Sequence, residues 1–319
     1  MKIGLLDVDK YNGISKSFPN IALMKFSTFH KNKGDEVELY NQLCEYDLVY
    51  VSKIFDKNYS KEYPYKINGK RVIYGGLGYN NYDTSFIDNY EKLMPDYSIY
   101  SIDNVSYGFL TKGCPRNCKF CLVGQIDGAT TYKVADLSDW LNEDCKYIEI
   151  CDPNMLAFEN HLELLQQLLD SNKIINFNQG LDVRLLNDEN VELLRKMKIK
   201  RFNFAWDNPQ ENLLSLFDKW RDKLTSNKNR SDYSKFQVYV LVNFNSTPIE
   251  DLYRVEKLKA IGYDPYIMIY DKPSAPLETK RLQRWVNMKS TFRSCCFEEY
   301  QKKTTQVING QLNLIIESR

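Results

Sequence analysis

Residues 107–124 read YGFLTKGCPRNCKFCLVG, and this stretch decides how the rest of the chain is interpreted. An apolar segment, Tyr107–Thr111, runs directly into a polar loop in which Cys114, Cys118 and Cys121 form a C-x3-C-x2-C pattern. Three thiolates on one short loop can bind three irons of a cubane cluster and leave the fourth iron without a protein ligand. A zinc site needs a fourth ligand and usually pairs its cysteines in two C-x2–4-C knuckles. The pattern therefore predicts a [4Fe–4S] site on this cysteine loop, Cys114–Cys121.

The cysteine loop resembles the signature of the radical S-adenosylmethionine (SAM) superfamily, including the aromatic Phe120 directly before the third cysteine. The resemblance implies that Cys114, Cys118 and Cys121 bind a [4Fe–4S] cluster, that SAM chelates its open iron, and that Phe120 lies against the adenine. In that superfamily the cofactor carries the radical chemistry, because one electron from the cluster breaks a carbon–sulfur bond of SAM. The resemblance thus implies a flavodoxin- or ferredoxin-type electron donor as a partner.

Strand-like and helix-like segments alternate from about residue 105 onward. Strands are predicted at Tyr107–Thr111, Tyr147–Cys151, Ile175–Gln179, Arg201–Trp206, Gln237–Phe244 and Pro265–Tyr270. Between them, apolar residues recur at helical spacing, and Thr247–Glu250 has the form of a capping box with proline at the first helical position. Six successive βα units predict a parallel sheet that curls into a partial (β/α)6 barrel of TIM type. We expect this radical SAM barrel to span residues 101–290.

Residues 1–100 predict a small α/β region of flavodoxin type. Its strands are expected at Ile3–Val8, Val37–Tyr40, Leu48–Val51 and Arg71–Tyr74, with a helix from Pro19 through Phe29. The region resembles the cobalamin-binding-like domain of B12-type radical SAM proteins at Asp7-Val-Asp9, Pro19-Asn20 and the turn Gly75–Tyr79. The D-x-H-x-x-G histidine of the cobalamin loop is absent, so cobalamin stays open as an additional cofactor. Residues 291–319 are interpreted as a C-terminal tail.

Polar residues follow the predicted barrel strands, at the carboxyl ends where active sites of such folds lie. The candidate SAM-binding residues are Asp152, Asn154, Gln179, Asp182, Arg184, Asp207 and Asn245. Asp152 and Asn154 are the candidates for the SAM amino group, because the commoner Gly-Gly-Glu ending is absent there. Arg184 is suited to clamping a carboxylate or phosphate. Asp and Asn at βα junctions also cap helices, and this alternative stays open for Asp207 and Asn245.

Composition limits the partners. The chain has 43 Lys plus Arg against 42 Asp plus Glu, so its net charge of +1 does not indicate nucleic acid. The opening residues MKIGLLDVDKYNG lack the layout of a signal peptide, and no apolar run approaches the ~20 residues that span a membrane. We expect a soluble cytoplasmic protein with no membrane partner. The adjacent Cys295 and Cys296 are too few to hold a second cubane.

Three functions remain open at this point. The first is a radical SAM enzyme whose 5′-deoxyadenosyl radical abstracts hydrogen from an unidentified substrate. The second is a cobalamin-dependent radical SAM methyltransferase with the same cluster. The third is a non-catalytic iron–sulfur or zinc protein that binds a partner or senses redox state.

Overall fold

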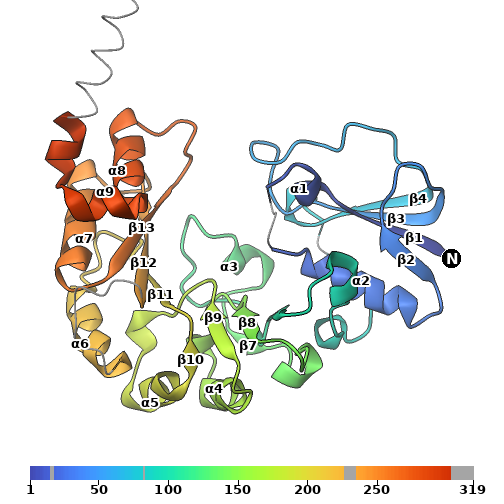
Figure 1. Cartoon of the computed structure of the whole chain (residues 1–319), viewed down its shortest axis with the longest axis horizontal. Helices are drawn as coiled ribbons and strands as arrows, with labels where there is room; N and C mark the ends of the chain where they lie inside the picture. The colour runs from blue at the N-terminus through green and yellow to red at the C-terminus, as the bar shows by residue number, and fades with distance from the viewer. Residues whose placement is uncertain (15–17, 82, 226–234, 303–319) are drawn as a thin grey trace, which may run out of the picture. The chain divides into compact units, whose positions relative to one another are not determined.

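The computed structural model describes residues 1–14, 18–81, 83–225 and 235–302 (Figure 1). The chain divides into two compact units. Unit 1 consists of Met1–Lys112, Tyr132–Asp152 and Asp170–Ile175, and unit 2 consists of Gly113–Thr131, Pro153–Leu169 and Asn176–Arg319. The units interleave along the chain, whereas the sequence predicts contiguous parts ending at residues 100 and 290.

Unit 1 begins with a parallel four-stranded sheet. Its strands are β1 (Lys2–Asp7), β2 (Glu36–Leu39), β3 (Tyr46–Ser52) and β4 (Gly69–Gly75), in the order β2-β1-β3-β4. A flavodoxin-type sheet begins with the same strand order. The helices of that fold are only partly present, because residues 40–45 and 53–68, all of which are described, contain no helix.

Two helices follow β1. The short α1 (Val8–Tyr11) is succeeded by α2 (Ile21–Lys31), whose N-cap Asn20 accepts a hydrogen bond from Leu23 N. Because successive residues of a strand point to opposite faces, β1 contributes to two apolar clusters. Leu23 of α2 packs with one face of the sheet, and the members of that cluster are Ile3, Leu5, Leu23, Leu48 and Tyr50. A second cluster, on the other face of the sheet, consists of Leu6, Val8, Tyr46, Val49 and Val51.

Nine further strands of the described residues form three more sheets. Four of them, β5 (Val105–Gly108), β8 (Tyr147–Ile150), β9 (Ile174–Phe177) and β10 (Lys198–Ile199), lie in the order β10-β9-β8-β5. The strands β11 (Phe202–Ala205), β12 (Phe236–Val242) and β13 (Asp264–Ile269) form a separate parallel sheet in unit 2. The short strands β6 (Thr111–Lys112) and β7 (Tyr132–Lys133) form an antiparallel pair. The first precedes the segment that contains the cysteine loop, and the second follows it.

The predicted α/β class with parallel sheets is confirmed, but the six expected barrel strands lie in two sheets. The short β10 occupies the edge beside β9, where the next barrel strand would pair. The strand β11 contacts the residues after β9 through a single parallel bridge, in which Leu181 N donates to Asn203 O at 2.7 Å. One continuous barrel sheet therefore stays a prediction.

Helices follow the strands as the periodicity predicts. They are α3 (Val123–Ile126), α4 (His161–Asp170), α5 (Asp188–Lys196), α6 (Leu214–Leu224), α7 (Pro248–Ala260), α8 (Leu277–Asn287) and α9 (Lys289–Ser294). The start of α7 is confirmed, with Thr247 and Glu250 forming a reciprocal capping box and Pro248 in the first turn. None of the described helices has the length and apolarity needed to cross a membrane.

The outer edge of β13 is covered by side chains that follow it in the chain. Asn287 Oδ1 accepts a hydrogen bond from Ile267 N at 2.9 Å, and Gln283 Nε2 donates to Ile267 O at 3.2 Å. Lys289 Nζ donates to Pro265 O at 2.6 Å. Backbone groups that would otherwise pair with another strand are thus satisfied, which ends the sheet at β13.

Candidate functional site

The backbone of the cysteine loop turns sharply at two positions in unit 2. Gly113 has a φ of 76°, and a Cβ atom there would lie 2.0 Å from Thr130 O, so only glycine fits. Asn117 adopts a φ of 45°, a left-handed conformation that asparagine tolerates better than most residues. Cys121 N then donates to Cys118 O at 2.9 Å. These turns fold the segment that carries the three cysteines into a short loop.

The three cysteine side chains are free thiols, partly exposed to solvent. Burial raises the pKa of Cys118, and the charges of Cys121, Cys114 and Asp207 raise it further, while Arg184 opposes them. Cys114 and Cys121 thus act electrostatically on the thiol of Cys118. In the described part of the chain, however, no group of three His, Cys, Asp or Glu side chains has an arrangement that could hold a metal ion. The donor set of three free thiols on one loop fits a cubane cluster chemically.

Asn154 lies beside the first cysteine and is 5% exposed. Its Nδ2 is 3.7 Å from Cys114 Sγ and 3.5 Å from Asp182 Oδ2. Its Oδ1 is buried without a hydrogen-bond partner. Because an unsatisfied buried acceptor is costly, this atom is suited to a ligand that donates a hydrogen bond.

Asp182 connects the cysteine loop to the segment after β9. Its Oδ2 accepts from Arg116 Nε at 2.7 Å, and its Oδ1 accepts from Arg184 Nε at 2.7 Å. Burial alone would raise the pKa of Asp182, but the hydrogen bonds and charges of Arg184 and Arg116 outweigh it and lower the pKa. Arg184 also forms an ion pair with Glu211. Arg184, which is predicted to bind a carboxylate or phosphate, therefore pairs with two carboxylates of the chain itself, those of Asp182 and Glu211.

Asp207 follows β11 and carries a buried carboxyl group. Burial raises its pKa to about 6, against the opposing hydrogen bond from Leu241 N at 3.2 Å and the charges of Arg254 and Arg184. Arg254 Nη1 donates to the backbone oxygens of Trp206 and Asp207 at 2.7 and 3.2 Å, which fixes the end of the strand. Asp207 also raises the pKa of Cys118, and its role as a SAM-binding residue stays a prediction.

Asp152 belongs to unit 1 and has a different environment. Its carboxylate accepts hydrogen bonds from Leu110 N at 2.8 Å and from both Thr111 N and Thr111 Oγ1 at 2.6 Å. Burial nevertheless raises its pKa to about 7. Both oxygens are used to hold the segment that leads into the cysteine loop. Of the two candidates for the SAM amino group, Asn154 is the one with an unpartnered oxygen.

Aromatic rings gather around Phe120. Its ring centroid is 5.4 Å from that of Phe244, which is 4.7 Å from that of Tyr270, both in edge-on geometry. Phe120 is partly exposed to solvent at the cysteine loop. Edge-on aromatic contacts of this kind stabilise a fixed ring orientation.

The remaining predicted residues, Gln179 and Asn245, are exposed, and Asn245 has a left-handed φ of 51°. The neighbouring Asn178 has a buried Nδ2 without a partner, which makes it a better candidate than Gln179 for binding a polar ligand.

Arg116 is a site residue that the sequence does not predict. Its position between two of the cysteines was the available signal, but its partner Asp182 is 66 residues away in the chain.

No protein-family model matches the chain, and no curated protein is significantly similar to it in sequence. The cysteine pattern and the contacts around it are therefore the features of the chain that bear on its function.

Proposed function

We propose that this chain is a radical SAM enzyme, in which Cys114, Cys118 and Cys121 hold a [4Fe–4S] cluster. When bound, the cluster supplies the electron for reductive cleavage of SAM, which starts radical chemistry on a substrate that is not identified. The observation that carries the proposal is the C-x3-C-x2-C loop with three free thiols, in which Cys121 and Cys114 raise the pKa of Cys118. The two parallel sheets would belong to a partial barrel with its site at the carboxyl ends of the strands.

The neighbouring residues have roles that this proposal explains. Asn154 Nδ2 points its N–H toward Cys114 Sγ, and such hydrogen bonds tune a sulfur-ligated cluster. Arg116 and Asp182 hold the loop in place through an ion pair. The buried Asn154 Oδ1 and Asn178 Nδ2 provide one acceptor and one donor for a polar ligand. Phe120 offers its ring face to the adenine of SAM.

Anaerobic reconstitution tests the proposal. The protein is expected to bind about four iron ions per chain and, with dithionite, to convert SAM to methionine and 5′-deoxyadenosine. Cys114→Ala should abolish both the cluster signal in electron paramagnetic resonance and the nucleoside product measured by mass spectrometry. Cys44→Ala, a change of a free cysteine outside the loop, is the matched control and should retain both. SAM cleavage by the Cys114→Ala protein would refute the proposal.

A cobalamin-dependent methyltransferase is the second candidate, favoured by the β2-β1-β3-β4 strand order of unit 1. It predicts corrin absorbance after reconstitution and S-adenosylhomocysteine among the products. Metal binding without any SAM binding, measured by calorimetry, would instead favour a non-catalytic iron–sulfur or zinc protein.

A further inference from the structure

The parallel sheet β11-β12-β13 of unit 2 has two faces that differ in chemistry. On one face, Phe217 of α6 contacts Phe204 of β11 at a ring-centroid distance of 6.0 Å, and α7 lies on that side too (Figure 1). Alternate residues of each strand point to the opposite face, which is called the inner face below. The strand register places on it Asn203, Ala205, Gln237, Tyr239, Tyr266 and Met268.

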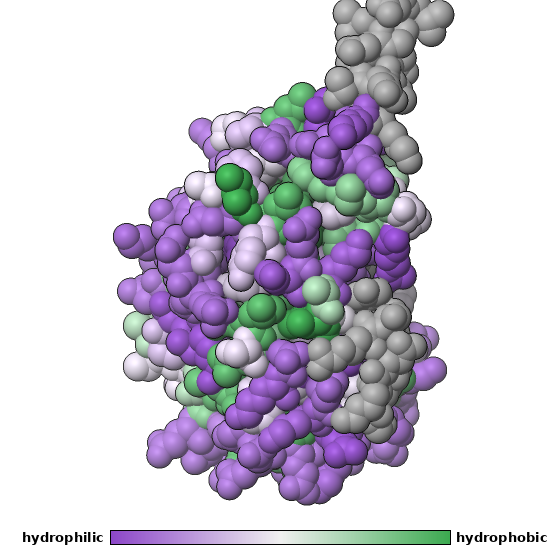
Figure 2. Space-filling model, turned by 90° about the vertical axis from the view of Figure 1, so that its left-hand side faces the viewer, coloured by the Kyte–Doolittle hydropathy of each residue, from purple (hydrophilic) through white to green (hydrophobic). Residues whose placement is uncertain are grey.

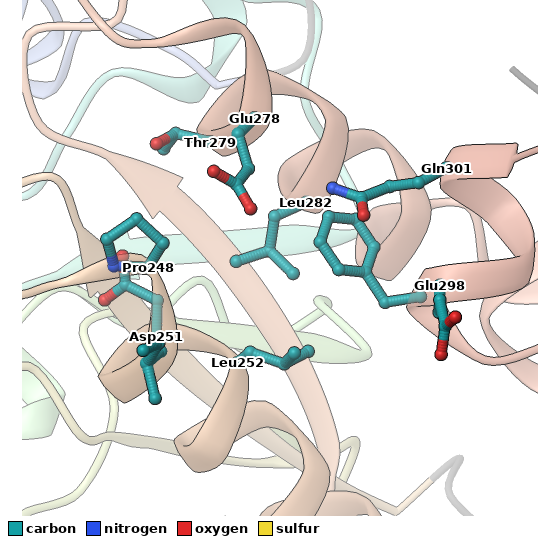
Figure 3. A pocket seen from close by; sticks show the side chains of 10 residues that line it. Pro248, Asp251, Leu252, Glu278, Thr279, Leu282, Glu298 and Gln301 are labelled. Atoms are coloured by element: carbon teal, nitrogen blue, oxygen red, sulfur yellow. The ribbon is translucent and has the colours of Figure 1, made fainter. Parts of the chain in front are cut away.

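The helix side of the sheet has few features that indicate a ligand. Figure 2 shows this side of the molecule, where apolar side chains are scattered among hydrophilic ones. A groove lies there between α7 and α8 (Figure 3), but two of its acids, Asp251 and Glu298, pair with Arg254 and Lys302. None of the described polar side-chain atoms that line this groove is buried without a partner.

A chain of three amide side chains begins at Asn203 on the inner face. Asn203 Nδ2 donates to Phe177 O at 3.0 Å and to Asn176 Oδ1 at 3.2 Å. Asn176 Nδ2 in turn donates to Asn178 Oδ1 at 2.8 Å. Because a backbone carbonyl can only accept, Phe177 O fixes which end of the Asn203 amide faces it. The direction of the other two amides follows from that of Asn203.

Each end of this amide chain has a buried polar atom without a partner. Asn178 Nδ2 is a donor and Asn203 Oδ1 is an acceptor, and neither forms a hydrogen bond with a described residue. Asn203 as a whole is only 4% exposed. Because an unsatisfied buried polar group is costly, the two atoms indicate a ligand that provides one acceptor and one donor.

Aromatic rings lie beside these amides on the inner face. Tyr266 is 40% exposed, and its ring centroid is 6.0 Å from that of Tyr239, in edge-on geometry. Tyr239 pairs in register with Ala205, which follows Asn203 by two residues on the same face. Only a methyl group therefore occupies the position between the tyrosines and the amide chain on β11.

The inner face presents no unpaired charge among the described side chains of its three strands. Its charged residue, Asp264, lies 2.8 Å from Lys289 Nζ, which also donates to Pro265 O at 2.6 Å. A carboxylate or phosphate would find no counter-charge here, and a hydrocarbon would leave the two amide atoms unsatisfied. A neutral planar ring with a donor and an acceptor on its edge meets both conditions.

We propose that the inner face binds a nucleobase, which stacks on the tyrosine rings and bonds through its edge to Asn178 Nδ2 and Asn203 Oδ1. Aromatic side chains stack on bases, and side-chain amides bind the donors and acceptors of base edges. Both amide atoms are covered in the unliganded chain, so binding includes rotation of side chains on this face, which is common when a ligand binds. The base belongs to the substrate of the radical reaction, and in this respect the inference rests on the proposed function.

Binding of nucleosides to the full-length chain tests the proposal. Uridine and guanosine are the probes, because neither base is part of SAM. At least one of them should bind in isothermal titration calorimetry, both to the iron-free chain and to the chain with a reconstituted cluster. No binding of either probe to either form would overturn the proposal. Base binding is measured here without SAM cleavage, so its failure is distinguishable from failure of the radical SAM assignment.

Asn178→Asp tests the edge contact. It keeps the oxygen that accepts from Asn176 and replaces the free N–H group by a second oxygen, so it should weaken probe binding at least tenfold at pH 7. Asn160→Leu changes an exposed amide of unit 2 outside the inner face and should leave the affinity unchanged. Equal affinities of Asn178→Asp and the wild type would contradict the assigned contact.

Tyr266 variants test the stacking. Tyr266→Leu should weaken probe binding about tenfold, whereas Tyr266→Phe keeps the ring and should bind like the wild type. N-acetylglycinamide carries a donor and an acceptor without a ring. If it bound as tightly as the nucleosides, the ligand would be a peptide and the nucleobase proposal would be wrong.

Discussion

Asp182 is the residue on which the geometry of the cysteine loop depends most directly. Its two oxygens accept hydrogen bonds from Arg116 within the loop and from Arg184 after β9. Hydrogen bonds to charged groups contribute roughly 1.5–3 kcal/mol each, and the Asp182 side chain is only 6% exposed. Losing the charge should therefore loosen the loop without unfolding unit 2.

Asp182→Asn is predicted to weaken retention of the cluster. In a reconstituted protein challenged with a chelator, its charge-transfer absorbance should decay about tenfold faster than in the wild type, because Arg116 loses a charged partner. Glu211→Gln is the matched control, since it removes the other acid of Arg184 and leaves the Arg116 contact intact. Equal decay rates for Asp182→Asn and the wild type would show that this ion pair does not position the loop.

The raised pKa of the buried Asp207 carboxyl group leads to a second prediction about a single residue. Its folded-state pKa of about 6 lies above the ordinary value of 3.8, so the folded chain binds a proton that the unfolded chain releases between about pH 4 and pH 6. The Asp207 contribution to stability is therefore full below pH 4 and is lost as the pH rises to 6. Asp207→Asn keeps the acceptor for Leu241 N and removes the titration.

A shift of about 2 pKa units corresponds to about 3 kcal/mol. Between pH 4 and pH 7, the free energy of urea unfolding of the iron-free Asp207→Asn chain should therefore increase by about 3 kcal/mol relative to that of the iron-free wild type. Glu250→Gln is an informative control, because the pKa of Glu250 is lowered by its hydrogen bonds to Thr247 and the variant should not show this gain. A constant difference between Asp207→Asn and wild type across this pH range would contradict the assignment.

At the scale of elements, local patterns predicted the helices and strands well. Thr247, Pro248 and Glu250 fixed the start of α7 because capping is a local interaction. Strands were found within a few residues of their expected places, since buried parallel strands are short apolar runs. The separation into two sheets was not predicted, because it depends on which strand occupies the edge of β9, and the two-residue strand β10 carries almost no sequence signal.

In the candidate site, too, the local patterns could be predicted from the sequence, and the contacts between distant residues could not. The spacing of Cys114, Cys118 and Cys121 is visible in the sequence because all three are on one loop. The use of Asp152 by Leu110 and Thr111, and of Asp182 by Arg116, required the fold, because these partners are 41 to 66 residues apart. From sequence position alone, an acidic residue that holds a backbone segment looks the same as an acidic residue that is free to bind a ligand.

At the scale of the whole molecule, unit 1 is built from segments that are distant in the sequence. Met24 of α2 packs with Tyr97 and Tyr107 in one apolar cluster. Tyr97 Oη donates to Trp140 O at 3.0 Å, and the Trp140 side chain is fully buried. A chain that ends at residue 100 keeps Met24 and Tyr97 but loses the residues that cover them.

We therefore predict that a fragment of residues 1–100 does not fold stably, whereas a fragment of residues 1–152 does. The longer fragment retains the cluster around Tyr97 and the pairing of β5 with β8, in which Tyr107 lies opposite Glu149. Exposing Met24 and Tyr97 costs roughly 1.5–3 kcal/mol for each side chain, a large share of the stability of about 5–15 kcal/mol that a domain typically has. Thermal unfolding followed by circular dichroism should show a cooperative transition for residues 1–152 alone. A cooperative transition of residues 1–100 at the same temperature would mean that the first hundred residues form an independent domain, as the sequence boundary predicts, and that the interleaved division does not govern stability.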